Sequence, residues 1–157
     1  MRLALYQPDI PQNLGTMLRL AACLNVGVDI IEPCGFPLDD KRIKRAGMDY
    51  LADLEFLRHK SWNDFLSVKS GRVILMTTKS STSLLHFKFR ASDILLLGRE
   101  SAGVPEIVHE GCEGRLLIPM AKGKRSLNVA AAAAIALGEG LRQTNGYPRL
   151  NEIEDEI

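Results

Sequence analysis

Five short apolar segments constrain the fold of this 157-residue chain more than any other feature of its sequence. They are nearly continuous aliphatic runs, at residues 3–6, 28–31, 72–77, 93–97 and 115–118. Strands that lack a polar alternation are typical of parallel sheets covered by helices on both faces. Because helical patterns separate these runs, the sequence predicts an α/β fold, a single domain with a mostly parallel sheet flanked by helices.

The helical patterns lie at residues 14–22, 39–46, 61–68 and 127–143. Asn13 and Ser61 are placed to cap the first and third of these helices at their N-termini. Asn145, Gly146 and Pro148 follow the last helix, which is rich in alanine, as expected at a helix end. Folds of this kind bind ligands beyond the carboxyl ends of their strands, so we expect the functional residues there.

Composition and charge set broad limits. The chain is 46% hydrophobic and 25% charged, as in soluble globular proteins, and it has no apolar run of membrane-spanning length. The apolar N-terminus is short and predicts a strand rather than a signal peptide, so we expect a cytoplasmic protein without a membrane partner. The net charge is only +1, but residues 150–157 form an acidic tail, expected to be disordered, on a basic body. Such a body is compatible with RNA binding.

Several common site motifs are absent from the sequence. No GxGxxG follows the first strand, and Arg99 stands where a nucleophile elbow has glycine. The cysteines and histidines are widely spaced, which argues against a metal site: Cys23, Cys34, Cys112, His59, His86 and His109. We expect the thiols to be buried or half-buried, and each histidine to be a surface or packing residue.

Three segments follow predicted strands and carry more polar residues and glycines than folding requires, at residues 8–19, 97–105 and 118–129. Each also has a purely structural interpretation. Arg19 is then a solvated side chain on a capped helix, Pro105 starts a helix after a turn, and Ser126 or Asn128 caps the last helix.

Together the three segments resemble the signature motifs of the SPOUT superfamily of RNA methyltransferases, and the resemblance runs from Leu3 to about Pro148. The small size is similar to the minimal branch, which methylates the ribose 2′-hydroxyl of the tRNA wobble nucleotide, cytidine or modified uridine. Further similarities to this branch are Ile31-Glu32-Pro33, Gly35-Phe36 and residues 39–42, 45–50, 77–79 and 146–148.

The resemblance implies a methyltransferase domain over residues 1–149 with a trefoil knot at its carboxyl end. It also implies S-adenosyl-L-methionine as the methyl donor, S-adenosyl-L-homocysteine as the product, no metal, a tRNA substrate and a homodimer. The 2′-hydroxyl distinguishes RNA from DNA, so DNA is excluded as a substrate of this reaction.

Site residues carry over from the resemblance position by position. The cofactor-binding positions are Met76, Thr77, Gly98, Ile118, Ser126 and Leu127. The catalytic positions are Asn13, Arg19, Glu100, Ser126 and Asn128. Two departures from the branch are Arg99, in place of a frequent proline, and the alanines from Ala130 onward.

The residues we favour for RNA contact are Arg19, Lys41, Arg42, Lys44 and Arg45. For the last four, a solvated helix with acidic residues at its start is an equal alternative. The proton acceptor for the 2′-hydroxyl also stays open. The family favours Arg19, but arginine rarely loses its proton, so Arg19 can instead bind the adjacent phosphate while Glu100, phosphate or water takes the proton.

Three alternatives to wobble methylation remain at this point. The chain can act on another tRNA position or on ribosomal RNA, although relatives that modify ribosomal RNA often carry an additional RNA-binding domain. It can also be a non-catalytic RNA-binding α/β domain, against which the full set of catalytic positions argues.

Overall fold

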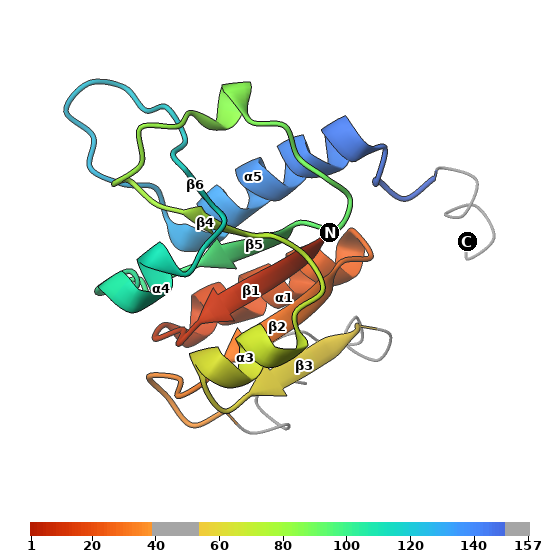
Figure 1. The fold of residues 1–157 in the computed structure, drawn as a ribbon, viewed down its shortest axis with the longest axis vertical. Coiled ribbons are helices and arrows are strands. Elements are labelled where there is room, and N and C mark those ends of the chain that lie inside the picture. Colours follow the sequence, from red (N-terminus) through yellow and green to blue (C-terminus); the bar gives the residue numbers. More distant parts are fainter. Residues whose placement is uncertain (39–53, 150–157) are drawn as a thin grey trace.

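A parallel six-stranded sheet forms the centre of the computed structural model, which describes residues 1–38 and 54–149 (Figure 1). Its strands are β1 (Arg2–Tyr6), β2 (Gly27–Ile31), β3 (Phe56–His59), β4 (Val73–Met76), β5 (Ile94–Leu97) and β6 (Gly114–Leu116). The order is β3-β2-β1-β5-β4-β6, and every pairing between neighbours is parallel. The predicted fold class is confirmed, and the five predicted strands are present within two residues at each end.

Helices cover both faces of the sheet: α1 (Pro11–Cys23), α3 (Trp62–Val68), α4 (Glu106–Glu110) and α5 (Val129–Thr144), with a 3-10 turn, η2, at Leu84–His86. One core cluster joins the strands to Met17 and Leu18 of α1 and to Leu137 of α5. The other joins them to Phe65 of α3 and Val108 of α4. The strands are therefore buried on both sides, which explains their continuous apolar sequence.

The helix ends test the predicted caps. Ser61 accepts a hydrogen bond from the Asp64 backbone and caps α3 as predicted, and Asn145 ends α5 in the left-handed conformation (φ 52°). Asn13 as a cap is wrong, because α1 starts with Pro11 after Ile10, which makes no side-chain cap. A proline at the first helical position needs no backbone donor, so the Asn13 side chain remains available for other contacts.

The strand order changes direction between β1 and β5. From β1 the chain adds β2 and β3 on one side, and it then crosses to build β5, β4 and β6 on the other. Loops that follow β1 and β5 therefore diverge at this point, and such a switch point is where open α/β sheets bind ligands. It lies beside residues 8–10 and 98–105, within two of the three segments marked in the sequence.

Some expectations stay predictions. The charged helix at residues 39–46 and the acidic tail lie outside the described residues. The trefoil knot and the domain boundary at residue 149 rest on the resemblance. Within residues 1–38 and 54–149, no helix is long and apolar enough to cross a membrane.

Candidate active site

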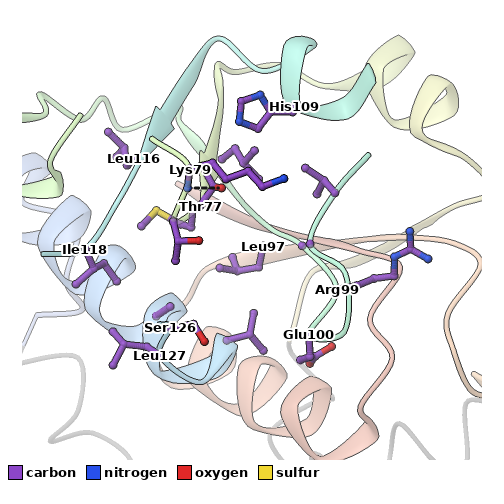
Figure 2. A pocket seen from close by; sticks show the side chains of 18 of the residues that line it. Thr77, Lys79, Leu97, Arg99, Glu100, His109, Leu116, Ile118, Ser126 and Leu127 are labelled. Carbon is purple, nitrogen blue, oxygen red and sulfur yellow. Dashed lines mark hydrogen bonds between the residues drawn. The ribbon is translucent and has the colours of Figure 1, made fainter. Parts of the chain in front are cut away.

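A cavity of about 350 Å³ opens at the carboxyl ends of β4, β5 and β6, against the start of α5 (Figure 2). All six positions predicted to bind the cofactor line it: Met76, Thr77, Gly98, Ile118, Ser126 and Leu127. They come from three different strand ends and the loop before α5, because parallel strands bring their carboxyl ends to one edge of the sheet. Leu75, Leu97 and Leu116 add apolar walls.

The loop after β5 is a tight turn that needs its glycines. Arg99 and Gly103 exchange two backbone hydrogen bonds of 3.0 and 2.8 Å, and Gly103 has φ +64°. A Cβ on Gly98 would lie 2.8 Å from the Gly103 carbonyl carbon, closer than side chains allow. The turn therefore presents backbone to the cavity, where a larger residue at position 98 would displace it.

A chain of side-chain hydrogen bonds joins three of the predicted catalytic residues. Asn128 Nδ2 donates to Asn13 Oδ1 at 3.0 Å, and Asn13 Nδ2 donates to Glu100 Oε1 at 3.0 Å. Asn128 also caps α5, since its Oδ1 accepts from Ala130 and Ala131. Residues far apart in the sequence thus meet beside the cavity. Glu100 and the fourth predicted residue, Ser126, line it, whereas Asn13 and Asn128 are not among its lining residues.

Asp9, which the sequence analysis did not single out, holds Glu100 in place. Its carboxylate accepts from the backbone nitrogens of Glu100 (3.0 Å) and Ser101 (3.3 Å) and from the Ser101 hydroxyl. In return the Asp9 backbone donates to Glu100 Oε2 at 3.3 Å. The only available signal in the sequence was an acidic residue three positions after a strand, between two prolines.

The two carboxyl groups have opposite electrostatic shifts. Contact with Glu100, supported by hydrogen bonds from Ser101, lowers the pKa of Asp9 to about 2. Burial first, and the nearby Asp9 second, raise the pKa of Glu100 above its ordinary value. Of the two, Glu100 therefore holds a proton more readily, as expected when two carboxyl groups share one site.

The remaining predicted residues lie elsewhere. Arg19 is exposed on α1 and is not among the described residues that line the cavity. Lys41, Arg42, Lys44 and Arg45 lie outside the described residues.

Other residues differ from expectation. His109, expected to be a surface or packing residue, lines the cavity together with Lys79 and Glu106. Cys112 is buried and Cys34 half-buried, as predicted, but Cys23 is exposed because it ends α1 away from the core. The described residues contain no group of three ligating side chains that would hold a metal.

Comparison with known proteins matches residues 1–138 to the model of the SpoU rRNA Methylase family. The chain belongs to the SpoU methylase family. A relative from Beijerinckia indica, named tRNA (cytidine(34)-2′-O)-methyltransferase, is 54% identical over 151 residues, which cover 94% of each chain. A protein of the same name from Escherichia coli is 35% identical over 151 residues, covering 94% of this chain and 96% of that one.

Two solved structures share the fold of this chain. One, described as addressing 2-OH methylation of C/U34 on tRNA, has a TM-score of 0.84 and 41% identity, and covers 90% of this chain and 94% of that one. A second is the SpoU methyltransferase AviRb from Streptomyces viridochromogenes in complex with the cofactor AdoMet. It has a TM-score of 0.80 and 25% identity, and covers 91% of this chain and 60% of that chain.

Proposed function

We propose that this chain transfers a methyl group from S-adenosyl-L-methionine to the ribose 2′-hydroxyl of nucleotide 34, the wobble position of tRNA. The observation that carries the proposal is the hydrogen-bonded chain of Asn128, Asn13 and Glu100 beside a cavity formed by the predicted cofactor positions. The names of close relatives support the same reaction and the same nucleotide. The relatives' names specify cytidine as the modified base, and the description of one solved neighbour includes both cytidine and uridine at position 34.

The cavity fits the methyl donor on the residues present. Its apolar walls suit an adenine ring, and the tight turn after Gly98 lets backbone approach a ribose. Two buried side-chain nitrogens that lack a hydrogen-bond partner, Arg99 Nε and His109 Nε2, belong to residues that line it. Unsatisfied buried donors at a cavity are typical of ligand contacts. When bound, the donor supplies an electrophilic methyl group on a sulfonium.

The residues around the cavity would then orient the hydroxyl and accept its proton. Displacement needs the hydroxyl oxygen about 3–3.5 Å from the methyl carbon and in line with the leaving sulfur. Asn13 and Asn128, fixed by each other and by the start of α5, are placed to position the ribose. Glu100, with its raised pKa, is placed to accept the proton, while Arg19 binds the neighbouring phosphate.

A second copy of the chain would complete the site. Exposed apolar residues lie just before α1 and on or next to α5: Ile10, Leu127, Ile135 and Tyr147, together with the exposed Ala131 and Ala134 of α5. Such a strip suits a homodimer, as the resemblance implies. Because Arg19 is outside the cavity of its own chain, we propose that it serves the cavity of the partner.

Mixed dimers test the reaction, and they also test whether Arg19 acts in the cavity of its own chain or in that of the partner. Arg19→Ala should abolish transfer of a labelled methyl group to tRNA while folding and cofactor binding persist, and Gly98→Val should abolish cofactor binding. Co-expressed with different tags, the two inactive chains should form a heterodimer with one working site. Restored activity supports Arg19 acting across the dimer. An inactive heterodimer with both chains folded places Arg19 in its own chain's site. Arg142→Ala, an exposed arginine on α5, is the matched control.

Substrate choice needs a separate measurement. Mapping of ribose methylation in cells that lack this protein should show loss at tRNA position 34 and nowhere in ribosomal RNA. We further propose that Lys41, Arg42, Lys44 and Arg45 contact the tRNA backbone. Lys41→Ala with Arg42→Ala should raise the KM for tRNA and reduce its salt dependence, with kcat unchanged at saturating tRNA. An unchanged KM would favour the solvated-helix alternative.

A further inference from the structure

The cavity has a charged end that none of the predicted positions occupies. Figure 2 shows His109 and Lys79 on one side of the cavity, across from Ser126, Leu127 and Glu100. Glu106, one turn before His109 on α4, also lines the cavity, and its Oε1 lies 3.9 Å from His109 Nδ1. A basic, an acidic and an imidazole side chain therefore meet at a place that the catalytic amides do not reach.

The hydrogen bonds of His109 define which ring nitrogen carries a proton. Arg115 Nε lies 3.2 Å from His109 Nδ1, and a guanidinium can only donate. Nδ1 is therefore the acceptor, and the ring proton resides on Nε2. That nitrogen is buried and has no partner in the described protein, although its residue lines the cavity. His109 thus holds an N–H donor without an acceptor at this end.

The charges beside His109 indicate what that acceptor belongs to. Lys79 follows β4, and its backbone nitrogen donates to Thr77 Oγ1 at 3.2 Å, which fixes the start of its side chain at the cavity (Figure 2). A lysine and an imidazole N–H together suit a carboxylate. The Glu106 carboxylate, 76% exposed, suits an ammonium group. A phosphate matches the first pair but is repelled by Glu106, whereas an α-amino acid matches all three.

We infer that His109, Lys79 and Glu106 bind the α-amino carboxylate end of the methyl donor. This inference rests on the proposed function, and it divides the cavity into an apolar part for the nucleoside and a charged part for the amino acid. Carboxylate oxygens then accept from His109 Nε2 and Lys79 Nζ, and the ammonium faces Glu106. The sulfonium, which joins the two halves of the donor, is left to face Glu100 and Ser126.

Calorimetry with two ligands tests the assignment. S-Adenosylhomocysteine carries both halves, whereas 5′-methylthioadenosine has the nucleoside and thioether without the amino acid. His109→Leu and Lys79→Met should each weaken binding of S-adenosylhomocysteine about tenfold, the effect expected of a lost hydrogen bond to a charged group, and leave 5′-methylthioadenosine unchanged. His86→Leu and Lys88→Met, exposed residues outside the cavity, are the matched controls and should change neither.

The other outcomes would overturn the inference. An equal loss for both ligands would place the nucleoside at this end. If the variants lose affinity for neither ligand, or if they raise the KM for tRNA with unchanged cofactor affinity, the charged end does not bind the amino acid part of the donor. Arg115 keeps its bonds to the His109 and Glu110 carbonyls in His109→Leu, so folding should persist, and Lys79→Met tests the same contact independently. If the wild-type protein binds neither ligand, the proposed function itself fails.

Discussion

Two polar clusters of similar size lie at different parts of the sheet, and they differ in how their carboxylates are neutralised. In the first, Asp29 on β2 bonds His59 at 2.7 Å and Arg2 at 2.7 Å, and Arg2 also pairs with Glu55. In the second, Asp9 and Glu100 face one another across the switch point, with amides rather than cations as neighbours. Asp29 and His59 are almost fully buried, whereas Glu100 borders the cavity.

The difference separates a cluster that links strands of the sheet from one that borders the candidate active site. Asp29 is a buried carboxylate that two basic partners hold in place. Two carboxyl groups in contact must differ in proton affinity, and the raised pKa of Glu100 expresses this. Perturbed carboxyl groups beside a cavity are typical of active sites, while paired ones inside a sheet are typical of structural links.

The largest expected effect is on stability in the first cluster. Asp29→Ala leaves His59 and Arg2 without their shared partner, and removal of one member of a buried pair lowers the free energy of unfolding by about 3–5 kcal/mol. Urea unfolding measures it. Glu139→Ala, which breaks an exposed ion pair, is the control and should cause a far smaller change. Equal changes in the two variants would contradict the structural role of Asp29.

Substitution in the second cluster should lower the rate of methyl transfer rather than the stability of the fold. Glu100→Gln keeps an oxygen for the Asn13 side chain but cannot accept a proton, so kcat should fall about 100-fold or more, the usual contribution of a general base. The free energy of unfolding and the affinity for S-adenosylhomocysteine should stay near wild type. A kcat near wild type would assign the proton to phosphate, water or Arg19.

A smaller effect on kcat is expected from Asp9, which acts through its contact with Glu100. Asp9→Asn places an amide where the Glu100 and Ser101 backbone donors point, so Glu100 should be less well oriented and kcat should fall about tenfold, the range for one lost charge-assisted hydrogen bond. Asp9→Glu should recover part of the rate because it restores the charge. Ser101→Ala, which removes only the hydroxyl contact, should have less effect than Asp9→Asn.

The smallest effect is a shift in pH dependence. If Glu100 accepts the proton in its ionised form, the rate rises with pH through the pKa of Glu100. Asp9 helps to raise that pKa, so Asp9→Asn should lower it and move the acid side of the kcat profile to lower pH. A kcat that falls at every pH, with no shift of the profile along the pH axis, would show that Asp9 acts on the geometry of Glu100 alone.

The sequence predicted the strands and the edge of the sheet at which the cavity lies for the same physical reason. Continuous apolar runs such as residues 93–97 identify buried strands, and their carboxyl ends identify the site edge. β3 was not predicted, because it is an edge strand in which Leu57 and Arg58 are exposed and the apolar run is interrupted. Asp9 and His109 were missed because their partners, Glu100 and Arg115, become neighbours only through the fold.

The Asn13–Asn128 hydrogen bond has a consequence for the order of events during synthesis. The two residues are 115 positions apart, and Asn128 is fixed only once α5 has started. A nascent chain folds from its N-terminus as it emerges, so β1, α1 and β2 can associate long before the second asparagine exists. Until α5 forms, Asn13 therefore lacks this partner, and the hydrogen-bonded chain to Glu100 is complete only with the final helix.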